Sequence, residues 1–267
     1  LRIADSGNAS INGRRVVPGG LHRYDIGVQL QEAGLPQRLR VHEAVRAVSS
    51  LYRDPGDVQG IIDALGLADR RRQMVDQLSG GWQRRLDIAL ACIGRPKLLI
   101  LDEPTSGLDP SARAELWEFL KRLRAQGVAV LASTHDLSEA ESFADRLLVL
   151  DRGRILLDGP VEQVLASAGG EWRLKVTDPD SGVDELLEAQ GAVPVRGQQH
   201  VTVIGDHETI LSYRQCLENA RTATRIEFQE STVGRVRLED VFAYAATLHT
   251  DEQASGRRSR EGTGESQ

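Results

Sequence analysis

A short apolar run that ends in two adjacent acids constrains the fold of this chain more than any other feature. Residues Leu98 to Leu101 are all aliphatic, and Asp102 and Glu103 follow directly. A run of this kind predicts a parallel strand buried on both faces. Ligands of open α/β sheets bind at the carboxyl ends of the strands, where one carboxylate can hold Mg²⁺ and the next can orient or deprotonate a water. The competing interpretation is a strand that stops at a polar turn.

Small residues lie shortly before this run. Ser79, Gly80 and Gly81 precede a predicted helix from about Trp82 to Ile93. The amino end of a helix carries free N–H groups and a partial positive charge, so it suits a phosphate group. The alternative interpretation makes Ser79 a helix cap, and both can be true at once.

A histidine follows another apolar run. Val128 to Ser133 predicts a second buried strand, and His135 comes just after its end. Because the carboxyl ends of parallel strands meet at one edge of a sheet, we expect His135 to lie at the same edge as Asp102 and Glu103. A lone histidine is more often a surface or core residue, but this position makes it a candidate site residue.

In their order and spacing these segments resemble the ATP-binding cassette (ABC) family. The resemblance covers about residues 1–166 and implies an α/β fold, a P-loop NTPase-like ABC cassette that binds ATP and Mg²⁺. Trp82 departs from the family, which most often has glutamine there. The matching segments are the signature motif (Leu78 to Gln83), the Walker B motif (Leu98 to Glu103), the D-loop (Ser106 to Asp109) and the switch histidine (His135).

The resemblance implies a catalytic role for several of these residues. Asp102 is the expected Mg²⁺ ligand, Glu103 is expected to polarise the attacking water, and His135 is expected to contact the γ-phosphate. Gln31 resembles the Q-loop glutamine, which contacts both Mg²⁺ and the attacking water in this family. Gln29 is the competing choice for that position.

Two cassettes of this family meet head to tail with ATP sandwiched between them. Ser79, Gly80 and Gly81 of one chain are expected to clamp the γ-phosphate bound on the opposite chain, with Gln83 as a further nucleotide-binding candidate. Asp109 is expected to touch across the interface. The resemblance also implies an integral membrane permease subunit as a partner. We therefore expect the chain at the cytoplasmic face of the plasma membrane, attached peripherally through that permease.

The phosphate-binding loop of such enzymes is missing from this sequence. No stretch of the form GxxxxGKS or GxxxxGKT occurs in the 267 residues. In the family, a stretch similar to Asp5 to Gly13 lies just after the helix that follows this loop. We therefore expect an N-terminally truncated cassette from an ordinary export ATPase. The alternatives are a catalytically incomplete subunit that acts as a regulatory or structural partner in a heterodimer, and a non-transport ABC protein of translation or DNA repair.

Composition narrows the class of protein further. The net charge of −6 argues against a nucleic-acid partner bound mainly through its phosphates. No apolar run approaches the ~20 residues that span a bilayer. Cys92 and Cys216 are isolated and have no metal-type spacing, which fits a reducing compartment.

The sequence predicts three parts. Residues 1–168 form the cassette, with a helical subdomain at about 41–95, and residues 250–267 are predicted to be disordered. Residues 169–249 form a small α+β appendage after Gly169 and Gly170. Its Leu238 to Phe242 segment resembles the C-terminal part of daunorubicin-type drug exporters. The predicted elements of the appendage are strands at 172–176 and 225–230, a strand or hairpin at 193–204, and helices at 183–190 and 208–219.

Overall fold

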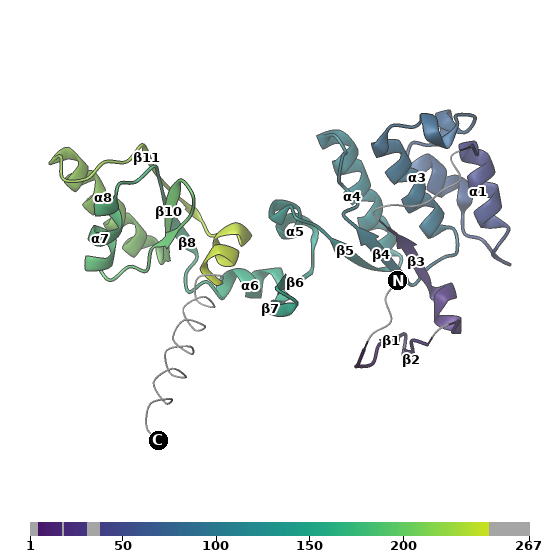
Figure 1. The fold of residues 1–267 in the computed structure, drawn as a ribbon, viewed down its shortest axis with the longest axis horizontal. Coiled ribbons are helices and arrows are strands. Elements are labelled where there is room, and N and C mark those ends of the chain that lie inside the picture. Colours follow the sequence, from purple (N-terminus) through teal and green to yellow (C-terminus); the bar gives the residue numbers. More distant parts are fainter. Residues whose placement is uncertain (1–4, 18, 31–37, 246–267) are drawn as a thin grey trace, which may run out of the picture. The chain divides into compact units, whose positions relative to one another are not determined.

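The computed structural model describes residues 5–17, 19–30 and 38–245. Gln31 and the tail predicted to be disordered lie outside the described residues. The chain divides into two compact units, Leu1–His135 and Asp136–Gln267, whose elements are labelled in Figure 1. Each unit has its own sheets, so we describe the two units separately.

The first unit contains a three-stranded parallel sheet in the order β3-β4-β5. Its strands are β3 (Ile26–Gln29), β4 (Leu98–Asp102) and β5 (Ala129–Ser133). The strands predicted from the apolar runs are therefore confirmed. Because the three strands are parallel, their carboxyl ends lie at one edge, and Asp102 is in register with Ser133.

Four helices accompany this sheet. The last of them begins cleanly because Asp109 caps it, accepting a hydrogen bond from the backbone N–H of Ala112, and Pro110 occupies its first position. The helices are α1 (Val41–Ser49), α2 (Val58–Ala64), α3 (Gly80–Cys92) and α4 (Pro110–Ala125), with the short turns η1 (Leu21–Asp25), η2 (Ala68–Arg70) and η3 (Val75–Gln77) and the small hairpin β1 (Ser10–Ile11) with β2 (Arg14–Arg15).

One face of the parallel sheet is buried and the other is not. Helix α3 packs so closely on β3 that a Cβ atom at Gly27 would lie 2.2 Å from the carbonyl oxygen of Ala91. Leu99 and Leu101 of β4 are fully buried on this side. On the opposite side Leu131 is 57% exposed. The prediction of strands buried on both faces was therefore wrong for that face, because no described element covers it.

A tryptophan at the start of α3 contacts two arginines, one on η2 and one on α3. The ring of Trp82 contacts two guanidinium groups, with the Cζ atoms of Arg70 and Arg85 at 3.8 Å and 4.9 Å from its centroid. Buried Arg85 also donates hydrogen bonds to the Leu65 carbonyl (3.1 Å) and to the Glu115 carboxylate (2.9 Å). The residue that departs from the family pattern thus fixes the start of α3 against η2.

The second unit contains two separate sheets. One is the hairpin of β6 and β7, and the other is a four-stranded antiparallel sheet in the order β11-β8-β10-β9. Residues 238–245 are helical as well. The elements are α5 (Leu137–Phe143), β6 (Arg146–Asp151), β7 (Arg154–Pro160), α6 (Val161–Ala166), β8 (Trp172–Thr177), α7 (Ser181–Ala189), β9 (Val195–Arg196), β10 (His200–Gly205), α8 (His207–Thr222) and β11 (Glu230–Arg235).

The last strand was predicted too early, at residues 225–230. Ile226 and Phe228 are both buried in the core beside α7 and α8, but they lie in an irregular segment. Their alternation is the pattern of a half-buried strand, and it reflects burial here without strand pairing. The strand itself, β11, begins at Glu230 and pairs with β8.

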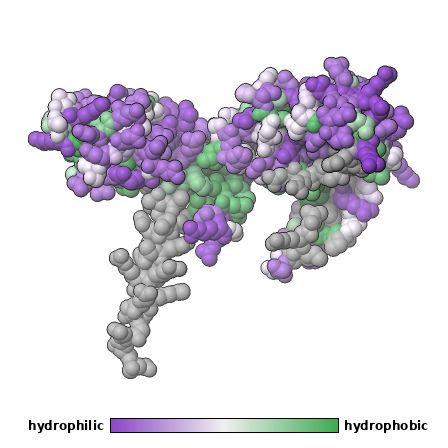
Figure 2. Space-filling view, turned by 45° about the horizontal axis from the view of Figure 1, so that its top comes forward, coloured by the Kyte–Doolittle hydropathy of each residue, from purple (hydrophilic) through white to green (hydrophobic). Residues whose placement is uncertain are grey.

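The hairpin belongs to the second unit because of its apolar contacts. Leu147 and Val164 share a buried cluster with Leu238 and Val241 from the end of the described chain. The two compact units therefore divide after His135, and the boundary predicted near Gly169 stays a prediction. The other side of the hairpin is apolar and open to solvent, as Figure 2 shows for this part of the surface. Its exposed residues are Leu148, Leu150 and Ile155.

Candidate active site

The carboxyl edge of the parallel sheet carries a connected set of polar groups. The Ser133 hydroxyl donates to Oδ1 of Asp102 (2.6 Å) and accepts from the backbone N–H of Glu103 (2.9 Å). One side chain of β5 thereby holds both the carboxylate and the peptide that follow β4. Sequence reasoning missed Ser133, although its position at the end of a predicted strand was the available signal.

Glu103 has a strained backbone. Its φ of +47° lies in the left-handed region, which residues other than glycine rarely adopt. Oε1 of Glu103 lies 3.2 Å from Nδ1 of His135, and these side chains are 31% and 76% exposed. The structure therefore brings Asp102, Glu103 and His135 together at one edge. Strain of this kind concentrates at functional sites.

The amino end of α3 is open. Ser79 stands at its N-cap position without a side-chain capping bond, and both Ser79 and Gly80 are exposed. A Cβ atom at Gly81 would lie 3.0 Å from a methyl carbon of Leu108, so the helix start packs against the predicted D-loop. The free N–H groups at the start of this helix can therefore meet an anion from outside the chain.

The remaining site candidates make hydrogen bonds within the chain. The Gln83 amide donates to the carbonyls of Val75 (3.1 Å) and Leu78 (3.2 Å), so it supports the turn before α3. Exposed Asp109 caps α4 through its Oδ1. The predicted nucleotide contacts of Gln83 and Asp109 stay predictions. Gln29 is 1% exposed and donates to the Leu30 carbonyl at 2.7 Å.

The donor set at the edge fits Mg²⁺. This ion is usually held by one or two carboxylates together with phosphate oxygens and waters. Asp102 offers one carboxylate, oriented by the Ser133 hydroxyl. Within the part of the chain that the structure describes, no group of three or more His, Cys, Asp and Glu side chains is arranged to hold a metal ion. A single oriented carboxylate suits an Mg²⁺ ion whose other ligands are phosphate oxygens and waters.

Two groups on α3 have strongly shifted pKa values. Burial raises the pKa of Asp87 to about 6, and the nearby positive charge of Arg84 acts in the opposite direction. Burial likewise raises the pKa of the Cys92 thiol to about 12. The Cys92 thiol is therefore protonated at neutral pH and has the character of a core residue.

Comparisons with known proteins agree with this geometry. A family model described as "ABC transporter" matches residues 1–106. The daunorubicin resistance ATP-binding protein DrrA3 of Streptomyces coeruleorubidus is 32% identical over 253 residues, which are 90% of this chain and 78% of that protein. A Nod factor export ATP-binding protein I of Burkholderia lata is 31% identical over 250 residues, covering 91% of this chain and 79% of that protein.

A further relative and a solved structure indicate the same family. The daunorubicin/doxorubicin resistance ATP-binding protein DrrA of Streptomyces peucetius is 34% identical, and the match spans 73% of this chain and 60% of that protein. The solved structure, described as an ATP-binding subunit of an ABC transporter, has a TM-score of 0.54 and 27% identity over 59% of this chain and 68% of that one. In the described residues no helix is both long and apolar enough to cross a membrane. The chain belongs to the ABC transporter family, among its ATP-binding subunits.

Proposed function

We propose that this subunit binds and hydrolyses ATP and thereby powers export through a separate membrane subunit. The observation that carries the proposal is the set of Asp102, Glu103, Ser133 and His135 at one edge of the parallel sheet. Two carboxylates, a hydroxyl and an imidazole in this arrangement suit phosphoryl transfer from ATP to water, which depends on positioning and charge stabilisation.

Each residue of this set has a distinct task in the proposal. Asp102 would hold Mg²⁺, which when bound neutralises charge on the phosphates. Glu103 orients the attacking water and accepts its proton. The hydrogen bond from its backbone N–H to Ser133 fixes the peptide from which the carboxylate projects. His135 lies beside Glu103 and completes the site toward the γ-phosphate. Gln31 is proposed as a further contact to the metal and the water.

The open amino end of α3 supports a second cassette as partner. Ser79 and Gly80 are exposed and Ser79 makes no side-chain capping bond, so the backbone donors at this helix start can face another chain. In the proposal they clamp the γ-phosphate of ATP bound on the opposite chain. The pair would close when ATP binds and open when the products leave. These movements would then move the membrane subunit.

The relatives suggest the kind of cargo. Their names refer to daunorubicin resistance and to Nod factor export. We propose an amphiphilic drug or a similar molecule as the substrate of the complex, with a membrane permease as the transport path. The subunit would then act peripherally at the cytoplasmic face of the plasma membrane.

The decisive experiment replaces the proposed base. In the full-length protein from its source, Glu103→Gln should leave ATP binding intact and reduce ATP turnover at least ~100-fold, because general base catalysis contributes about that much or more. Glu118→Gln, which changes an exposed carboxylate on α4, is the matched control and should keep the wild-type rate. Turnover by Glu103→Gln at close to the wild-type rate would remove Glu103 from this role.

The alternative that we propose is a catalytically incomplete subunit that donates its signature motif to a partner. The exposed start of α3 at Ser79 and Gly80 would present that motif. Photo-crosslinking with azido-ATP separates the two proposals. Labelling of the protein alone supports the ATPase, and labelling that requires a second ABC subunit supports the incomplete subunit.

A further inference from the structure

Exposed arginines gather on one surface of the first unit, where the start of α1 meets the segment between η2 and η3. This is a concentration of positive charge in a chain whose net charge is −6. Figure 1 shows α1 on the outside of the unit, beside α3. We call this surface the arginine patch, and its members are Arg38, Arg40, Arg46, Arg71 and Arg72, all exposed.

Hydrogen bonds hold the two stretches of the arginine patch together. The backbone N–H of His42 donates to the Arg71 carbonyl at 3.0 Å. The Arg40 guanidinium donates to the Arg72 carbonyl at 2.6 Å, although the two residues are 32 positions apart in the sequence. Arg46 follows His42 by one turn of α1, so the two residues share a face of the helix. The folded chain therefore brings these arginines to one surface.

The positive charge of the patch is not neutralised within the described residues. Arg40 donates to a main-chain carbonyl and Arg71 donates to the side-chain oxygen of Gln59, so both of these partners are neutral. The carboxylate of Glu43 accepts the backbone N–H of Arg40 at 2.7 Å and thereby caps α1. No ion pair joins an arginine of the patch to a carboxylate in this part of the chain. The other acids close by in the sequence are Asp69 and Asp76, both exposed.

The spread of the charges indicates an anionic partner with more than one phosphate. Arg40 stands at the N-cap of α1 and Arg46 in its last turn. At ~1.5 Å per residue, the six steps between them place their Cα atoms about 9 Å apart. The guanidinium group matches the geometry of phosphate oxygens through two parallel hydrogen bonds. Arginines spaced in this way fit a row of phosphates better than a single one.

A membrane surface supplies phosphates in such an arrangement. Clusters of about 4–8 lysines and arginines on an amphipathic helix bind anionic lipid headgroups. Helix α1 is amphipathic, since it buries Val41 and Ala44 and exposes its arginines. A flat membrane also meets only one face of the protein. Acidic groups on the other faces then lie beyond the Debye length of ~8–10 Å, so salt screens their repulsion from the lipid.

We propose that the arginine patch binds the anionic headgroups of a phospholipid membrane, with lipid phosphates between the guanidinium groups of Arg40, Arg46 and Arg72. This goes beyond the proposed function, because it gives the chain its own contact with the membrane. The contact needs no nucleotide and no membrane subunit. Loss of ATP hydrolysis would therefore leave it unchanged, and the two proposals fail independently.

Co-sedimentation of the full chain with vesicles tests the proposal. One kind of vesicle is an equimolar mixture of phosphatidylcholine and phosphatidylglycerol, which is anionic, and the other is phosphatidylcholine alone. At ~0.15 M salt the chain should sediment saturably with the anionic vesicles and stay in solution with the others. At ~1 M salt, where the Debye length falls to ~3 Å, the binding should be lost.

Variants show whether the patch is responsible. The side chains of Arg46 and Arg72 make no hydrogen bond within the described residues, so Arg46→Gln with Arg72→Gln leaves the packing intact. Each arginine near an anionic surface changes the binding constant about fivefold, so this double variant should bind about 25-fold more weakly. Arg214→Gln with Arg225→Gln removes two exposed charges from the second unit and should bind like the wild type. Equal thermal unfolding of the three proteins confirms that both double variants are folded.

Several outcomes would overturn the proposal. These are equal sedimentation with both kinds of vesicle, no sedimentation with either, or an equal loss of binding in the two double variants. Calorimetric titration with inorganic phosphate and with polyglutamate provides the last comparison. If either of them binds and the anionic vesicles do not, the partner is a free phosphate or an acidic protein segment instead of a membrane.

Discussion

Asp87 should lower the stability of the protein at neutral pH, and Asp87→Asn should raise it. The carboxyl group is partly buried on α3 and has no bonded partner among the described residues, and burial raises its pKa from 3.8 to about 6. At about 1.4 kcal/mol per pKa unit this amounts to about 3 kcal/mol. Because the group is also partly exposed to solvent, we reduce the figure to about 1–2 kcal/mol.

The sign of the effect follows from proton binding. Below about pH 4 the carboxyl is protonated in the folded and unfolded states, so it does not change the free energy of unfolding. Between pH 4 and 6 the unfolded state releases this proton while the folded state keeps it. The stability of the wild type therefore falls as the pH rises through this window. Asparagine has no proton to release, so the stability of the variant does not fall through this pH window.

Urea unfolding of both proteins from pH 4 to pH 8 measures the difference. The free energy of unfolding of Asp87→Asn should exceed that of the wild type by about 1–2 kcal/mol at pH 7.5, and by little at pH 4. Asp76→Asn, at an exposed carboxyl, should show no such pH dependence. A constant difference for Asp87→Asn across the range would refute the reasoning, since the carboxylate would then be paired, for example by Arg84.

Other predictions concern strain, a buried ion pair and a thiol. Glu103→Gly should raise the free energy of unfolding by about 0.5–1 kcal/mol, because glycine accepts the positive φ, while ATP turnover is lost. Asp240→Ala should lower the free energy of unfolding by about 3 kcal/mol. The Arg173 guanidinium, which donates two hydrogen bonds to Asp240 at 2.7 and 3.0 Å, would then be left without its partner. If a double variant with leucine at both positions is as unstable as Asp240→Ala, this account is contradicted. Cys92 should resist iodoacetamide at pH 8 until the chain unfolds, and mass spectrometry that finds it labelled in the native protein would show that its burial is incomplete.

The local elements of this chain follow from local patterns. The run from Leu98 to Leu101 predicted β4, and the Asp109–Pro110 pair predicted the start of α4. Such signals depend only on neighbouring residues, because strand propensity and helix capping act over a few positions. The resemblance to the ABC family rests on the same segments, and the comparisons confirm it.

The arrangement at the carboxyl edge was predictable only in part. Two strands that end in polar residues indicate one edge, which places His135 near Glu103. The left-handed backbone at Glu103 and the double hydrogen bond of Ser133 depend on the register of β4 against β5. Register is set by pairing between segments about 30 residues apart, and no local pattern reports it.

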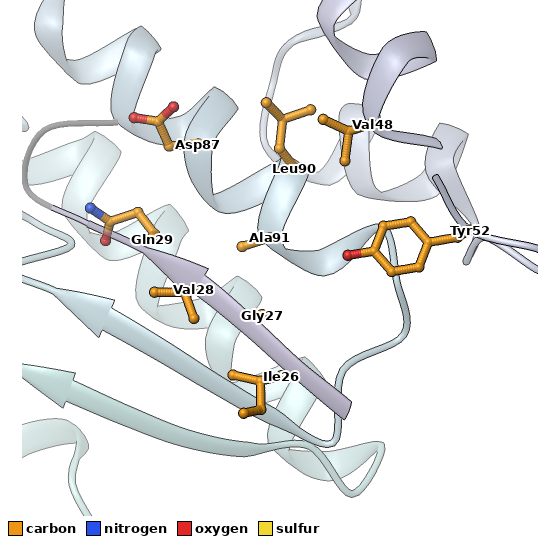
Figure 3. Close-up of a pocket in the computed structure, with 9 residues that line it drawn as sticks. All are labelled: Ile26, Gly27, Val28, Gln29, Val48, Tyr52, Asp87, Leu90 and Ala91. Atoms are coloured by element: carbon orange, nitrogen blue, oxygen red, sulfur yellow. The ribbon is translucent and has the colours of Figure 1, made fainter. Parts of the chain in front are cut away.

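What the sequence alone determined is the family and the order of its elements. Only the tertiary structure decided which positions are buried. It exposes Leu131 although it sits in an apolar run, and it buries Ile226 and Phe228 outside any strand. It also brings Gln29 and Asp87 into the lining of one pocket, as Figure 3 shows. The physical reason is that burial depends on what packs from elsewhere in the chain. Gln29 on β3 and Asp87 on α3 line the same pocket only because Gly27 lets the helix approach the strand.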